Sequence, residues 1–138
     1  MDIFISSENR KEVLQLPIVP EQLSVKFPHN NQTFSTISDG DIKLIGMPGL
    51  KSIAFDSWWP MKEYSFAKSS LMGTEAKEFF VKWKRKRRPI RVIIINNAGY
   101  EFHNELYAID EFTFGFDRAG DMTYSLALEQ FVTKQVKK

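Results

Sequence analysis

The sequence contains no cysteine among its 138 residues. Disulfide bonds, thiolate metal sites and cysteine nucleophiles are therefore excluded, and this absence favours a protein that resides inside the cell. Histidine is scarce as well. The two histidines, His29 and His103, are too far apart in the chain to form a local metal-binding or catalytic motif. We expect both to be solvated surface side chains.

Long hydrophobic runs are also missing. No apolar segment approaches the roughly 20 residues that a helix needs to span a bilayer, and residues 1–10 lack the basic and apolar regions of a signal peptide. Phosphate-binding loops of the type G-x-x-x-x-G-K-[ST] and nucleophile elbows of the type G-x-S-x-G do not occur. We expect a soluble protein that is not an enzyme and binds no cofactor, metal, small-molecule substrate or membrane.

What the chain does contain is aromatic residues and one dense block of positive charge. Its 12 phenylalanines predict a core in which aromatic packing dominates. The length suits a single domain, residues 1–138, with a normal core. Lysine and arginine total 19 against 17 aspartates and glutamates, so the net charge is only +2. Basicity is therefore local, which weakens the case for a protein dedicated to nucleic acid.

The spacing of apolar residues predicts about nine short strands and one helix. Apolar runs bounded by turn residues read as hairpins, and Asp39-Gly40 is typical of a hairpin turn. Ile53 and Phe55 alternate with polar or small residues, as in a half-buried strand. Strands are also expected at 90–96, 100–103 and 108–116, followed by a last strand with Met122, Tyr124, Leu126 and Leu128 on one face. Residues 60–73 have no clear period, and we expect a mobile loop there.

The helix is expected from about Glu75 to Arg87, with Thr74 as its N-cap. Pro89 should end it, because the residue before a proline avoids the α region. One apolar stripe is predicted along this helix, formed by Ala76, Phe79, Phe80 and Trp83. Strands joined by tight turns pair antiparallel. The predicted fold is therefore mainly β, of the α+β class: an antiparallel sandwich or open barrel with one helix covering an edge or end.

The dense block of cations at the end of this helix has three interpretations. It comprises Lys84, Arg85, Lys86, Arg87 and Arg88. It could be the solvated C-terminus of a helix, where cations meet the last carbonyl groups. It could be a patch that docks on an acidic protein surface. It could also form, as residues 84–91, a small β-type nucleic-acid-binding module. That alternative needs exposed aromatic rings for base stacking, whereas Trp83 is expected to be buried.

A second unusual segment is Trp58-Trp59-Pro60. Adjacent residues on a strand point to opposite faces, so one tryptophan can enter the core while the other faces outward. An outward tryptophan favours an assembly interface, where this residue type is enriched. The other interpretation is that the loop at 60–73 folds back over the outer ring.

Four segments, in this order, resemble those of a phage protein family. They are LPIVPEQLSV (16–25), GLKSIAFDSWWP (49–60), WKRKRRPIRVII (83–94) and AGDMTYSLALEQF (119–131). The family is the N-terminal module of the LysM-bearing tail and baseplate proteins of contractile phages, PBSX-type prophages and phage-tail-like bacteriocins (tailocins). No single segment is specific, and the ordered set carries the resemblance.

This resemblance implies a structural component with the tail-tube type of fold, such as a tube initiator. It would assemble in rings and link the distal tail tube to the hub and baseplate, with tube, hub and wedge proteins as partners. It would be made in the bacterial cytoplasm and then join a phage tail or tailocin particle. We expect no LysM module, because the chain stops at Lys138 just after the last strand. The expected partner contacts are Trp58, Trp59, Pro60, the loop at 60–73, the block Lys84, Arg85, Lys86, Arg87 and Arg88, and the C-terminal tail.

Overall fold

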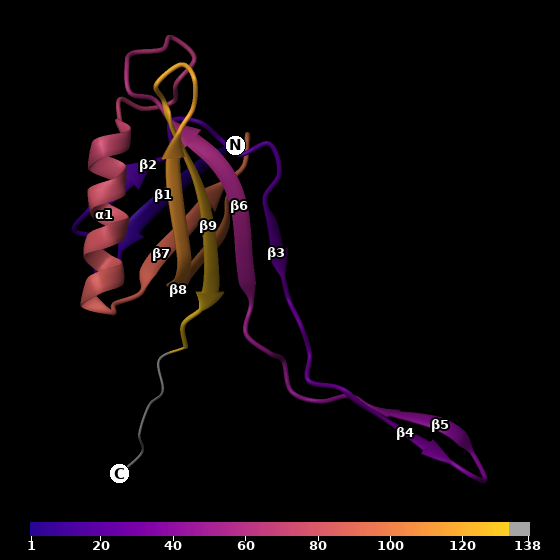
Figure 1. Ribbon diagram of the computed structural model, residues 1–138. Helices are drawn as coiled ribbons and strands as arrows, with labels where there is room; N and C mark the ends of the chain where they lie inside the picture. The colour runs from indigo at the N-terminus through magenta and orange to yellow at the C-terminus, as the bar shows by residue number, and fades with distance from the viewer. Residues whose placement is uncertain (133–138) are drawn as a thin grey trace, which may run out of the picture.

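The computed structural model describes residues 1–132, which form nine strands and one helix (Figure 1). The mainly β fold with one helix is thus confirmed. In chain order the elements are β1 (Asp2–Ser7), β2 (Val13–Gln15), β3 (Ser24–Lys26), β4 (Gln32–Thr36), β5 (Gly40–Leu44), β6 (Ser52–Trp59), α1 (Gly73–Lys86), β7 (Ile90–Ile95), β8 (Glu101–Phe116) and β9 (Met122–Gln130).

Seven of the strands form one antiparallel sheet in the order β2-β1-β7-β8-β9-β6-β3. The sheet is open, with β2 and β3 as its two edges. The 16-residue strand β8 belongs to both halves of the sheet. Its first half pairs with β7 and its second half, from Tyr107 onward, pairs with β9. A register shift between Ile109 and Glu111 interrupts the β8–β9 ladder, as expected of a bulge that bends a strand.

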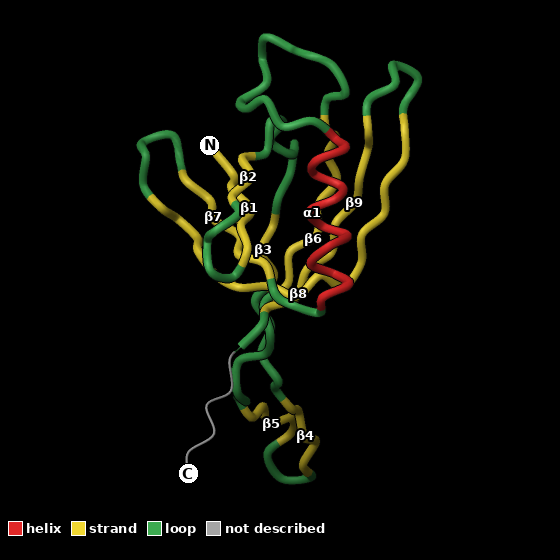
Figure 2. The backbone as a smooth tube through the Cα atoms, turned by 90° about the vertical axis from the view of Figure 1, so that its left-hand side faces the viewer, coloured by secondary structure: helices red, strands yellow, loops and turns green. Residues whose placement is uncertain are grey.

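The core lies between α1 and the face of the sheet that α1 covers (Figures 1 and 2). Side chains at every second position of the strands fill this core, as predicted from the alternation in the sequence. On β9, the four residues of the predicted face, Met122, Tyr124, Leu126 and Leu128, are all buried. On β8 the aromatic face is only partly covered. Phe112 packs against the core, whereas Phe114 and Phe116 near the end of the strand remain exposed.

Helix α1 is confirmed with small corrections to its ends. Its N-cap residue is Met72 rather than Thr74, and no side chain caps it. A Cβ at Gly73 would lie 2.8 Å from Sδ of Met61 and 3.1 Å from Cβ of Met122, so a larger residue here would require these side chains to shift. Arg87 ends the helix in the left-handed conformation, with φ of 57°. Among the described residues no helix is long and apolar enough to cross a membrane.

Among residues 1–132, strands β4 and β5 pair only with each other, and they project away from the sheet (Figures 1 and 2). We call residues 27–51, which leave the body after β3 and return before β6, the arm. The hairpin predicted at Asp39-Gly40 forms here, and Gly40 takes the positive φ of 69° that such turns require. The arm is thus a two-stranded extension outside the main core.

Candidate functional site

The two adjacent tryptophans point to opposite faces of β6, as the strand geometry predicts. Trp59 is fully buried, and its ring stacks on Phe80 of α1 and on Tyr124 of β9, with centroid distances of 5.6 and 3.8 Å. A side chain in this position cannot reach a partner while the domain is folded. The expectation that Trp59 contacts a partner is therefore corrected: it is a core residue. Pro60, the next residue, is also buried.

Trp58 lies on the other face of β6 and is partly covered by the loop that connects β6 to α1. Its ring meets those of Tyr64 and Phe66 edge-on, with centroid distances of 5.5 and 6.1 Å. The loop therefore folds back over the outer ring, which was one of the two interpretations. Phe66 remains exposed. We call Trp58, Tyr64 and Phe66 the aromatic patch.

Asp121, at the start of β9, anchors this loop to the body. One carboxylate oxygen accepts a hydrogen bond from the backbone N–H of Met61 at 2.9 Å, and the other accepts one from the hydroxyl of Tyr64 at 2.6 Å. Asp121 itself is buried. The Tyr64 hydroxyl, followed by the Met61 N–H, holds the pKa of Asp121 below its usual range, because both bonds favour the charged carboxylate. The aromatic patch is thus built on an ionised carboxylate.

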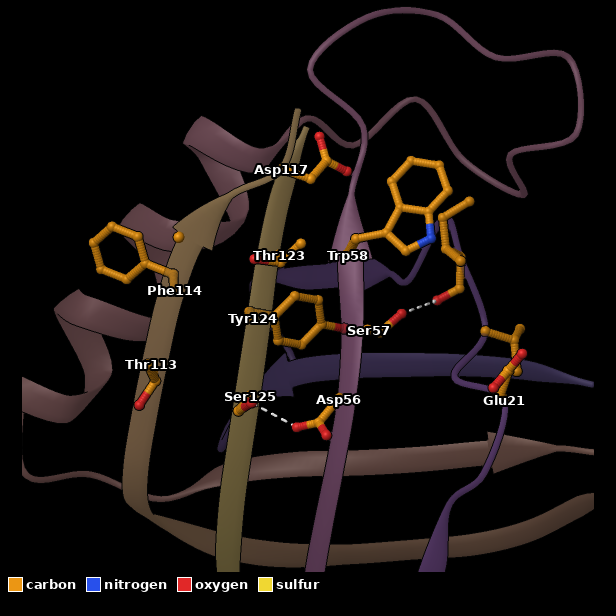
Figure 3. Close-up of a pocket in the computed structure, with 13 residues that line it drawn as sticks. Glu21, Asp56, Ser57, Trp58, Thr113, Phe114, Asp117, Thr123, Tyr124 and Ser125 are labelled. Atoms are coloured by element: carbon orange, nitrogen blue, oxygen red, sulfur yellow. Dashed lines mark hydrogen bonds between the residues drawn. The ribbon is translucent and has the colours of Figure 1, made fainter. Parts of the chain in front are cut away.

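A groove runs beside Trp58 on the outward face of β6, β8 and β9 (Figure 3). Its walls carry hydroxyl and carboxylate groups. Ser125 donates a hydrogen bond to Asp56 at 2.5 Å, and Ser57 donates one to the carbonyl oxygen of Ile18 at 3.3 Å. Of the residues that the structure describes, no histidine, lysine or arginine lines it. Within residues 1–132 no cluster of three or more potential ligands could hold a metal ion. The groove thus combines apolar side chains, among them Ile18, Val19 and Phe114, with hydroxyl and carboxylate groups.

The basic block lies at the exposed end of α1 and in the residues after it. Arg88 donates to both carboxylate oxygens of Glu8 in the β1–β2 turn, at 2.5 and 2.9 Å. Trp83 is half-buried, and the ammonium groups of Lys82 and Lys86 lie 5.1 and 5.2 Å from the centre of its ring. Lys84, Arg85, Lys86 and Arg87 are exposed. Because two lysines already lie over the Trp83 ring, it offers little surface on which a base could stack.

The arm has an apolar face that the sequence reasoning did not identify as a site. The pairing of Phe34 with Ile42, and of Gln32 with Leu44, puts three apolar side chains on one face of the hairpin. The side chain of Phe34 is 48% exposed, that of Ile42 40% and that of Leu44 51%. Ile37 at the turn is fully exposed. The opposite face carries Thr33, Ser35, Asp41 and Lys43. We call Phe34, Ile42 and Leu44 the arm face.

The two histidines differ in their surroundings. His29 is exposed in the arm, as predicted. His103 is not a free surface side chain: its imidazole is 12% exposed and lies 2.8 Å from the hydroxyl of Tyr107. Tyr107 is fully buried, and burial raises its pKa. The expected C-terminal contact, at 134–138, lies outside the described residues.

No protein-family model matches the chain. One curated relative is the uncharacterized protein YqbP of Bacillus subtilis (strain 168), 28% identical over 132 residues. The alignment covers 93% of this chain but 58% of YqbP, so the chain spans little more than half of that relative.

Solved structures with a similar fold come from particle tails and baseplates. A protein in the C6-symmetric tail of an empty gene transfer agent particle superimposes with a TM-score of 0.59 and 13% identity, covering 100% of this chain and 96% of that one. The two chains share a fold. A protein in the 6-fold symmetrised baseplate of the anti-feeding prophage gives 0.57 and 10%, with coverage of 95% and 88%. The expected likeness to tail and baseplate proteins is confirmed as a likeness of fold.

Proposed function

We propose that this chain is a non-enzymatic structural component of a contractile phage tail or tailocin. The observation that carries the proposal is the arm, whose apolar face is left largely uncovered by the rest of the described residues. An isolated two-stranded hairpin is at best marginally stable in water. Exposed apolar surface of this kind marks a protein interaction site. The arm face would therefore be buried against a neighbouring subunit of the particle.

In this proposal the chain links the distal tail tube to the hub or baseplate, as a tube initiator does. Ring assembly is supported by the fold, which resembles proteins in a C6-symmetric tail and a 6-fold symmetrised baseplate. Tube, hub and wedge proteins would be the partners, and assembly would take place in the bacterial cytoplasm. Besides the arm face, the aromatic patch and the exposed cations of the basic block would provide contacts. An acidic partner surface would complement these cations.

The test is assembly in cells that produce the complete particle. The variant Phe34→Ser with Ile42→Ser removes the arm face, and the matched control Thr33→Ala with Lys43→Ser changes the opposite face of the same hairpin. Tagged chains are captured, bound proteins are identified by mass spectrometry, and particles are counted by negative-stain microscopy.

We expect the unchanged chain and the control to recover tube, hub or baseplate subunits, and the arm-face variant to lose them while the body stays folded. Normal particles with the arm-face variant would contradict a role for the arm in assembly. Recovery of nucleic acid without tail proteins by the unchanged chain would contradict the proposed function as a whole.

A further inference from the structure

Lys51, the last residue of the arm, contacts both the root of the arm and the body. It stands where the arm returns to β6, and its ammonium group lies 5.0 Å from the centre of the Phe27 ring, where the arm leaves β3. Its backbone N–H donates to Oε1 of Gln130 at 3.1 Å, and its carbonyl accepts from the N–H of Gln130 at 2.7 Å. Lys51 therefore contacts both sides of the arm root and the end of β9.

The same lysine enters a polar cluster on β8. Its Nζ lies 2.7 Å from Oε1 of Glu105. The other carboxylate oxygen, Oε2, lies 3.4 Å from the Tyr107 hydroxyl and 3.6 Å from Nε2 of His103. His103, Glu105 and Tyr107 alternate along β8 and therefore point to one face. We call these three residues and Lys51 the root cluster.

The position of this cluster is unusual for charged groups. Its β8 residues stand opposite Ile94, Val92 and Ile90 of β7, which are all buried core residues. The side chains of Lys51 and Glu105 are only 22 and 30% exposed. Apolar residues would fill such a face at less desolvation cost, so a partly buried ion pair is weak support for stability alone. A salt bridge with satisfied hydrogen bonds instead holds its side chains in one defined arrangement.

We propose that Lys51 and Glu105 are positioning residues that fix the direction of the arm relative to the body, with the Tyr107 hydroxyl, itself hydrogen-bonded to His103, beside the Glu105 carboxylate. Within the part of the chain that the structure describes, strands β4 and β5 pair only with each other, so the direction of the hairpin depends on its root. If the proposed function holds, the pair presents the arm face to the neighbouring subunit at a constant angle. The proposal concerns the isolated chain, so it is tested without any assembly.

The absence of cysteine makes a direct test straightforward. Spin labels are attached to cysteines introduced at Ser38 in the arm turn and at Glu78 on the exposed side of α1, and the distribution of distances between them is measured by pulsed electron paramagnetic resonance. Glu105→Gln removes the charge from the pair and keeps its shape. The control Glu111→Gln removes a charge from an exposed residue of the same strand.

We expect a single narrow distance peak in the unchanged chain and in the control, and loss of that peak in Glu105→Gln. The reciprocal exchange of Lys51→Glu with Glu105→Lys should restore a narrow peak, which a purely structural loss of packing would not do. Circular dichroism reports whether each variant is folded. If Glu105→Gln unfolds the body, the distance distribution is measured in Lys51→Met instead, since this variant removes the other charge and keeps the aliphatic chain. A peak that stays narrow in the folded variant would overturn the proposal, as would equal broadening in the control.

Discussion

The indole ring of Trp59 lies face to face with the phenol ring of Tyr124, with centroids 3.8 Å apart and ring planes within 13° of parallel. The two residues are diagonal neighbours on paired strands, since Trp59 stands opposite Met122 and Tyr124 opposite Ser57. Diagonal positions of this kind are within reach of aromatic side chains. Through Phe80, this pair connects the sheet to α1.

The first prediction follows from that stack. Trp59→Ala should lower the free energy of unfolding by about 3–5 kcal/mol, because it removes a fully buried ring and leaves a cavity. Trp58→Ala, which removes the half-buried neighbour, should lower it by much less. Chemical denaturation followed by circular dichroism measures both values. Equal losses for the two variants would contradict the assignment of Trp59 to the core and Trp58 to the surface.

The second prediction concerns the loop between β6 and α1. Asp121→Asn should loosen this loop, because the amide keeps one acceptor oxygen where the carboxylate used two, for Met61 and Tyr64. Trypsin should then cleave at Lys62 or Lys68 faster than in the unchanged chain. Asp110→Asn, an exposed change on β8, serves as the control and should leave the cleavage rate unaltered.

The pKa of Asp121 gives the same contact a pH dependence. Because its folded-state pKa lies below 3.8, the stabilisation is fully present above that pH and is lost as the pH falls through the lowered value. The fluorescence of Trp58 reports on the same loop contact without the use of trypsin. In the unchanged chain it should therefore change only in this acid range. A change in the fluorescence of the patch near neutral pH would contradict the role of Asp121.

The third prediction concerns His103. Burial lowers its pKa from 6.5, Glu105 opposes this shift and Lys51 adds to it. The unfolded chain therefore binds a proton at a higher pH than the folded chain does. Stability should fall as the pH drops from above 6.5 toward the lowered pKa.

Denaturant midpoints at about pH 7.5 and about pH 5.5 bracket the range in which an unperturbed histidine titrates. His103→Gln should flatten the difference between them, while His29→Gln, in the exposed arm, should retain it. The reverse pattern would show that His103 is not the group responsible.

The fourth prediction separates protein docking from nucleic-acid binding at the basic block. Arg88 is paired with Glu8, and lysines lie over the Trp83 ring. We therefore expect DNA and RNA titrations at low salt to give at most weak binding. Tight binding that weakens steeply with added salt, and that is lost on Lys84→Glu with Arg85→Glu, would support the nucleic-acid module instead.

Much of the fold was predictable because local rules decided it. Alternation located β6 and β9, and an apolar stripe located α1. The long strand β8 was predicted as two pieces, because Asn104 and Glu105 interrupt the apolar pattern between them. The structure explains the interruption through long-range partners: Arg91 donates to Asn104, and Lys51, 54 positions before Glu105, neutralises its charge. No local pattern encodes such a pairing.

The candidate site was less predictable than the fold. That adjacent tryptophans face apart follows from strand geometry, but which of them is buried depends on the position of α1 and of the loop at 60–72. The arm face was missed for a related reason. Alternating apolar residues such as Phe34 and Ile42 look the same in sequence whether they face their own core or a surface.

The continuity of β8 has a mechanical consequence. At about 3.3 Å per residue, the 16 residues of β8 have a contour length of roughly 50 Å, and this one bent strand is shared by both halves of the sheet. A pull on either end of the strand would load its ladder to β7 or to β9 in shear, so that many hydrogen bonds resist together. A pull that separates β4 from β5 would open their ladder one rung at a time. Resistance to pulling is therefore unevenly distributed, being greater at the ladders of β8 than at the ladder between β4 and β5.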